Sequence, residues 1–146
     1  MDKPHLRLGR HTKFVLSHTC SDLNAGERAY MWHHFQCTFT SSALNAHVSF
    51  DTIVDSFVSF RDDLARVSRE LRGNAQLTTL ESDLRLEASI DKLGHIRWSG
   101  MLRHPGPVPE ETLEFWIEDD QTSLSRIIAE LDAIIADAQN DEYTLR

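Results

Sequence analysis

Cysteine is nearly absent from this sequence. Only Cys20 and Cys37 occur among 146 residues, and their spacing is not that of a metal site. This usage fits a reducing compartment, so we expect a cytoplasmic protein that needs no disulfide, metal or cofactor. Cys37 falls on the apolar side of an alternating segment, which predicts a buried thiol.

Glycine clusters and long hydrophobic runs are also missing. Each of the six glycines is solitary, which excludes a glycine-rich phosphate loop. No apolar run is long enough to span a bilayer. The polar, basic residues 1–13 lack the apolar stretch of a secretory signal. We therefore expect neither a membrane partner nor secretion.

Basic residues are scarce in the second half. Residues 1–73 hold nine Lys or Arg against eight Asp or Glu, net +1, whereas residues 74–146 hold six against fifteen, net −9. Between Glu110 and Glu142, eleven acids accompany a single base, Arg126. Such a surface repels phosphate backbones and anionic lipids and favours a basic protein partner over nucleic acid. A solvated acidic face that serves solubility remains an alternative.

What the sequence does contain is alternating and helical periodicity in a chain of the length of one domain, residues 1–146. Period-two alternation predicts strands near residues 6–8, 14–16, 31–40, 44–50, 84–90, 96–102 and 113–117. Residues 21–27 and the proline-rich residues 105–109 are expected to be loops.

Two segments carry helical periodicity. Residues 51–72 are predicted to form a helix, with Asp51 as its N-cap and Gly73 just beyond its end. Its core-facing stripe is predicted to contain Val54, Phe57, Leu64 and Leu71. A final helix should begin after a cap at Asp120 or Thr122, and the polar tail 137–146 is expected to fray.

The order of elements is strands, helix, strands, helix, with mostly short connections. This order predicts an α+β fold in which two helices pack on one face of antiparallel sheets.

No catalytic or metal-binding arrangement stands out. His33 and His34 are adjacent on a predicted strand, so they face opposite sides and cannot bind one metal together. Neither cysteine has the local context of a nucleophile. Clustered acids precede the final helix, where they cap the helix and meet its dipole. We therefore expect that the protein is not an enzyme.

Trp116 is the most informative single residue. Its neighbours Phe115 and Ile117 fall on the core row, so Trp116 points away from the core together with Glu114 and Glu118. A tryptophan bordered by acids has the composition of an interface anchor. The predicted partner-binding residues are Trp116, Glu114, Glu118 and Asp119. The alternative is that a loop or the N-terminal segment covers the ring.

Short motifs in the last third of the chain carry a family resemblance. They are Gly94-His95-Ile96, Gly100, Leu102-Arg103, Leu113-Glu114-Phe115 and Asp120-Gln121-Thr122-Ser123-Leu124. This stretch resembles the small bacterial immunity proteins of the WapI type, which are encoded beside polymorphic toxins and neutralise them. Residues 1–75 match that family only in element order, and the proline-rich loop departs from it.

The resemblance implies a cytoplasmic, non-enzymatic protein, monomer or homodimer, that binds a toxin domain and blocks its active site by occlusion. One alternative is a small acidic chaperone or adaptor for a secreted protein, which would need a large exposed apolar groove. Another is a small-ligand-binding protein or an enzyme that uses a cavity between sheet and helices.

Overall fold

The computed structural model describes residues 3–23, 31–104 and 110–145. These residues form two antiparallel four-stranded sheets, each in sequence order. The first sheet consists of β1 (His5–Leu8), β2 (Phe14–Leu23), β3 (Met31–Thr40) and β4 (Asn45–Thr52). The second consists of β5 (Asn74–Thr78), β6 (Leu84–Ile90), β7 (His95–His104) and β8 (Glu111–Asp120). Helix α1 (Asp55–Glu70) connects the sheets, and the short 3-10 helix η1 (Gln121–Ser123) leads into helix α2 (Leu124–Leu145).

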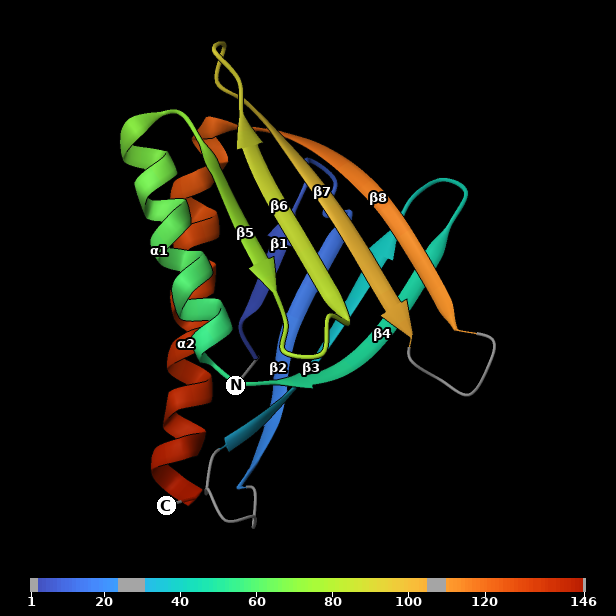
Figure 1. The fold of residues 1–146 in the computed structure, drawn as a ribbon, viewed down its shortest axis with the longest axis vertical. Coiled ribbons are helices and arrows are strands. Elements are labelled where there is room, and N and C mark those ends of the chain that lie inside the picture. The colour runs from blue at the N-terminus through green and yellow to red at the C-terminus, as the bar shows by residue number, and fades with distance from the viewer. Residues whose placement is uncertain (1–2, 24–30, 105–109, 146) are drawn as a thin grey trace.

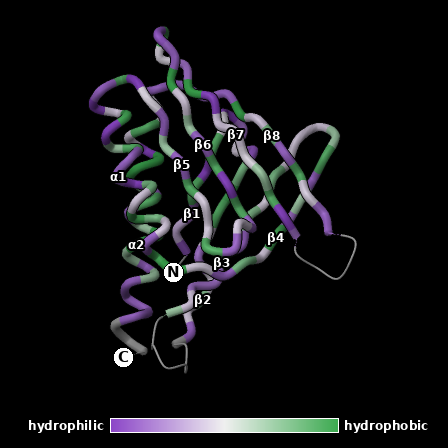
Figure 2. Tube along the Cα trace, in the orientation of Figure 1, coloured by the Kyte–Doolittle hydropathy of each residue, from purple (hydrophilic) through white to green (hydrophobic). Residues whose placement is uncertain are grey.

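The two sheets lie across one another, and both helices run side by side along one side of the molecule (Figure 1). The α+β architecture with the order strands, helix, strands, helix is therefore confirmed. Hydrophobic and hydrophilic residues alternate along the strands and form bands on the helices (Figure 2). The sequence analysis missed β5, because its five residues contain only two buried apolar side chains, Ala75 and Leu77.

The predicted ends of the first helix are wrong. Asp51 belongs to strand β4, so α1 begins at Asp55, and its N-cap position is held by Val54 without a side-chain cap. The helix ends at Glu70, because Leu71 adopts a left-handed conformation with φ 54°. Leu71 is consequently 53% exposed rather than part of the core stripe.

The polar tail is ordered rather than frayed, since α2 continues to Leu145. The prediction of a loop at residues 21–27 is wrong for its first three residues, because β2 extends to Leu23. The rest of that prediction, residues 24–27, and the predicted loop at the proline-rich residues 105–109 lie outside the described residues.

The core lies between the two sheets and against the helices. Phe115 of β8 stacks on two rings of the first sheet, Phe14 at 5.7 Å and Phe39 at 4.6 Å between centroids. Helix α1 contacts both sheets: the Phe57 ring lies 4.6 Å from that of Phe35, and the Phe60 ring 6.2 Å from that of Trp98. Aromatic pairs in this range add to the free energy that burial already contributes.

Candidate protein-binding interface

Most acids of the second half are bound within the molecule. The Glu130 carboxylate of α2 accepts hydrogen bonds from the guanidinium of Arg7, the shortest 2.7 Å, and from Arg126 at 2.8 Å. Lys3 donates to Asp137 at 2.8 Å. The acids of α2 therefore compensate bases near the start of the chain, and the charge difference between the two halves is partly an intramolecular attraction. Only acids without such partners are candidates for contacting another protein.

A buried chain of polar side chains joins the end of α2 to the first sheet. His18 Nδ1 lies 2.8 Å from Asp137 Oδ2, and His18 Nε2 lies 2.8 Å from Ser21 Oγ. The same Ser21 oxygen lies 2.6 Å from His33 Nδ1, and His33 Nε2 lies 2.9 Å from Glu142 Oε1. Both imidazoles are fully buried. Because every ring nitrogen has a partner, this chain stabilises the docking of α2 on strands β2 and β3.

The Asp137–His18–Ser21 part of this chain has the residue types of a nucleophilic triad. The Ser21 oxygen, however, lies between two imidazoles, and the residue is 7% exposed. A substrate carbonyl has no access to a hydroxyl in that position, so the arrangement is structural. Sequence reasoning missed it because its members are far apart along the chain.

The prediction that His33 and His34 face opposite sides is confirmed. His33 is buried, whereas His34 is half-buried on the outer face, where its Nε2 lies 2.7 Å from Asp22 and its Nδ1 contacts Asp51. Burial lowers the pKa of His34, but the hydrogen bonds to the two carboxylates outweigh this and raise it. Asp51, expected to cap α1, instead pairs with His34 across the sheet.

The acids at the junction of β8 and α2 have capping roles, as the sequence analysis favoured. Asp120 accepts a hydrogen bond from the backbone N–H of Thr122 at 2.9 Å, which lowers its pKa. Asp119 accepts from the Ser123 hydroxyl at 2.7 Å and from the Gly9 N–H at 3.2 Å. Asp119 therefore fixes the start of α2 and joins the turn after β1 to β8.

Three carboxylates of β8 remain unpaired. Glu111, Glu114 and Glu118 are exposed and form no ion pair within the described part of the chain. Glu118 lacks one even though Arg97 is its direct neighbour on β7. Along this strand, therefore, negative charge is left without an internal partner.

Trp116 lies between two of these carboxylates, on the outer face of the second sheet. The predicted orientation is confirmed: Trp116 is 57% exposed, whereas Phe115 and Ile117 are buried. Its neighbour on β7 is the small Ser99, and beyond Ser99 lies Glu87 of β6. No described loop covers the ring. Large exposed aromatic side chains on a rigid strand are typical of interface anchors.

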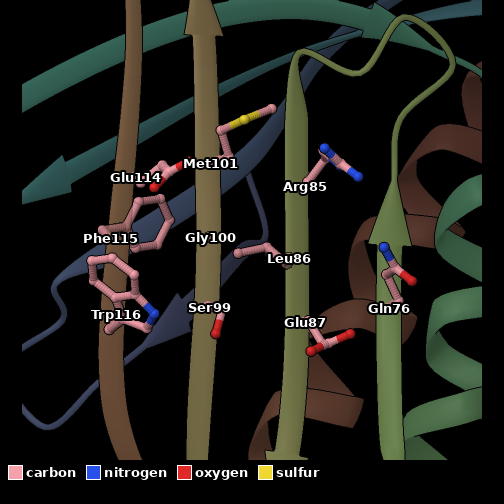
Figure 3. A pocket seen from close by; sticks show the side chains of 10 residues that line it. All are labelled: Gln76, Arg85, Leu86, Glu87, Ser99, Gly100, Met101, Glu114, Phe115 and Trp116. Atoms are coloured by element: carbon pink, nitrogen blue, oxygen red, sulfur yellow. The ribbon is translucent and has the colours of Figure 1, made fainter.

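A shallow hollow adjoins the tryptophan (Figure 3). Its volume is about 260 Å³, and its lining includes Trp116, Met101, Arg85 and Glu87. A wider hollow of about 920 Å³ lies on the other side of Trp116, between the turn after β1 and the end of β8, and Asp119 lines it. The surface around Trp116 thus carries charges of both signs, with acids on β8 and arginines on β6 and β7.

Other chemical sites are not evident in the described residues. They contain no group of three His, Cys, Asp or Glu side chains placed to hold a metal ion. Cys37 is buried as predicted, and burial, with the charge of Asp83, raises the pKa of its thiol to about 12. No described helix is long and apolar enough to cross a membrane.

Several solved structures match this chain, and two of them, both of plant proteins, match across 99% of it. One is described as "Structure of the plant transcriptional regulator PBF-2", with 8% identity, 85% of that chain covered and a TM-score of 0.49. The other is "Crystal Structure of WHY3 from Arabidopsis thaliana", with 9% identity, 92% covered and a TM-score of 0.45. Likeness at this level says nothing about function.

No curated protein sequence matches the chain. A family model does: the one described as "Immunity protein WapI-like family" matches residues 13–139. The match extends well beyond the last third, where the sequence resemblance lay, and includes strands β2 to β8 and most of α2. The chain belongs to the WapI-like family of immunity proteins.

Proposed function

We propose that this protein neutralises a cognate bacterial toxin by binding its toxic domain one to one and occluding the active site, without catalysis of its own. Family membership supports the role. The observation that carries the choice of surface is the exposed Trp116 on β8, bordered by the unpaired Glu114 and Glu118. Among the described residues, the two carboxylates have no ion-pair partner, and most of the Trp116 side chain is left uncovered.

Trp116 and the neighbouring carboxylates contribute to such a complex in different ways. Burial of the Trp116 ring in a pocket of the toxin stabilises the bound state, as large aromatic anchors do. The carboxylates attract a basic surface over a distance and accelerate association. A toxin that acts on nucleic acid needs a basic cleft to hold phosphates, and β8 complements that charge. Asp119 lies at the margin of this surface, where it also holds the junction of β8 and α2.

The described surface does not favour the chaperone alternative. A chaperone for an unfolded segment needs a continuous apolar groove. Apart from Trp116, the large exposed apolar side chains lie singly after α1 or in separate turns, at Leu44, Leu71, Leu80 and Leu93. Scattered apolar residues of this kind are normal for a folded surface.

Growth protection tests the proposal. The toxin domain encoded beside this gene is expressed from an inducible promoter, alone or together with the immunity protein. Protection by the wild type, reduced by Trp116→Ala, is the expected result. Leu71→Ala is the matched control, since Leu71 is similarly exposed and lies at the end of α1 next to the opposite edge of the sheet. If wild-type protein gives no protection and no complex, the proposed function is wrong.

A further inference from the structure

The four edge strands of the two sheets differ in whether side chains bind their free backbone groups. The edge of β1 is capped by α2: the Arg7 N–H donates to Glu130 at 3.0 Å, and the Arg7 carbonyl accepts from Arg126 at 3.0 Å. At β5, Arg66 of α1 donates to the Asn74 carbonyl at 3.2 Å. Side chains of the helices therefore satisfy backbone groups that would otherwise invite another strand.

Except at its end, where the Asp120 N–H donates to Asp119 Oδ1 at 2.9 Å, the edge formed by β8 has no such cover in the described part of the chain. This strand is the last of its sheet and pairs only with β7 over all ten of its residues, so every second residue directs its N–H and C=O away from the sheet. The open part of this edge, residues 111–119, is longer than a typical strand. It offers a continuous row of hydrogen-bonding groups to an incoming chain.

The remaining edge, β4, is the weaker candidate. Two of its outward side chains are engaged with β3: Asp51 contacts His34, and His47 lies 3.3 Å from Gln36. On β8, by contrast, Glu111, Glu114 and Glu118 have no ion-pair partner among the described residues. Among the described edge strands, therefore, open backbone groups and uncompensated charge coincide on β8 only.

We propose that an extended basic segment of the toxin adds to the free edge of β8 as a fifth strand of this sheet. The proposal rests on the proposed function and specifies how the partner is bound. Backbone hydrogen bonds set the register, and side chains directly opposite one another interact. Because Glu114, Trp116 and Glu118 share one face, the partner strand carries a basic, an apolar and a basic residue at alternate positions.

Charge argues against a second copy of this chain as the occupant. Strand β8 contains five acids and no base: Glu111, Glu114, Glu118, Asp119 and Asp120. Pairing two such strands would place ten carboxylates along one seam, and like charges facing each other destabilise a strand pair. A basic strand would instead be attracted to the carboxylates of β8.

Nuclear magnetic resonance of the complex tests the proposal. The immunity protein and the catalytically inactivated toxin domain carry different isotope labels, so that only contacts between the two proteins give cross peaks. The expected result is a ladder of Hα–Hα and amide cross peaks between β8 and one toxin segment. Alternate β8 amides should also exchange rapidly in the free protein and slowly in the complex.

The possible outcomes separate the two proposals. A complex that Trp116→Ala weakens, but that shows no backbone cross peaks to β8, overturns strand addition and leaves the proposed function standing. A ladder between two copies of β8 in the free protein also overturns it, because the edge would then belong to a homodimer. Absence of any complex overturns the proposed function itself.

Discussion

The ring of Phe115 lies directly on the backbone of Gly100, its partner across strands β7 and β8. A Cβ atom at position 100 would come within 2.2 Å of the Phe115 ring, so the position has no room for a side chain. Since Phe115 also stacks on Phe14 and Phe39 of the other sheet, this close approach sets how the two sheets meet.

Replacement Gly100→Ala should therefore destabilise the protein. Overpacking of a filled core typically costs about 1–3 kcal/mol, and the displaced ring would disturb its contacts with the first sheet as well. Urea denaturation measures the free energy of unfolding. Ser99→Ala, one residue away on the outer face, is the control and should stay within about 0.5 kcal/mol of wild type. Equal stability of both variants would show that Phe115 moves aside freely.

Phe57→Ala should destabilise the protein by roughly 3–5 kcal/mol, the usual cost of removing a buried ring. Phe57 is fully buried, and its ring packs on that of Phe35. Leu71→Ala should have almost no effect, although both residues belong to the same stripe by sequence periodicity. Thermal or urea unfolding distinguishes them. A similar loss in both variants would contradict the observed end of α1.

Phe57, Trp116 and Leu71 show which parts of the fold could be predicted from the sequence and which could not. Periodicity correctly placed Phe57 in the core and Trp116 on the outer face, because the period of side chains is a local property. The end of α1 was misjudged because a left-handed residue at Leu71 interrupts the helix while the apolar spacing continues.

The charge pattern shows a second limit of sequence reasoning. Eleven acids near the C-terminus suggested an interaction surface, but Glu130, Asp137 and Glu142 bind groups on the first sheet more than 100 residues away. Composition cannot distinguish a compensated carboxylate from a free one, because the partner is brought near only by folding. Among the described residues of β8, the acids without an ion-pair partner remain candidates for a partner-binding surface.

The pair of Asp137 and His18 should make stability depend on pH in the acid range. Burial raises the pKa of Asp137, but hydrogen bonds from His18 and Lys3 outweigh it, so the folded-state pKa lies below the ordinary value. An unfolded aspartate titrates near about pH 3.9. The stabilisation is therefore complete above that pH and is lost as pH falls through the lower folded-state value.

The variant Asp137→Asn isolates this contribution. The difference in unfolding free energy between wild type and variant should be largest near neutral pH and shrink below about pH 4, where the wild-type carboxyl is also neutral. Chemical denaturation at several pH values measures it. Asp132→Asn, an exposed residue of the same helix, should show little dependence. A difference that grows on acidification would contradict the assigned pairing.

Binding kinetics should separate the tasks of Trp116 and its neighbouring acids. Trp116→Ala should weaken the toxin complex through faster dissociation, since the loss of a buried anchor typically costs about 2 kcal/mol or more. Glu114→Lys combined with Glu118→Lys should instead slow association and flatten its dependence on salt, because exposed charges act mainly during encounter. Surface-immobilised toxin domain, measured at several ionic strengths, gives both rates.

The control for the Glu114→Lys, Glu118→Lys variant is a pair of lysine substitutions on α1 that changes the net charge by the same amount. Asp62→Lys with Glu70→Lys alters two exposed positions of α1 and should affect association much less than the β8 pair. All variants should keep the circular dichroism of wild type, because none of the replaced side chains is buried. Equal slowing by both lysine pairs would mean that net charge, rather than the acids of β8, steers the toxin. Unfolding of Trp116→Ala would mean that the ring is needed by the fold and is not a free anchor.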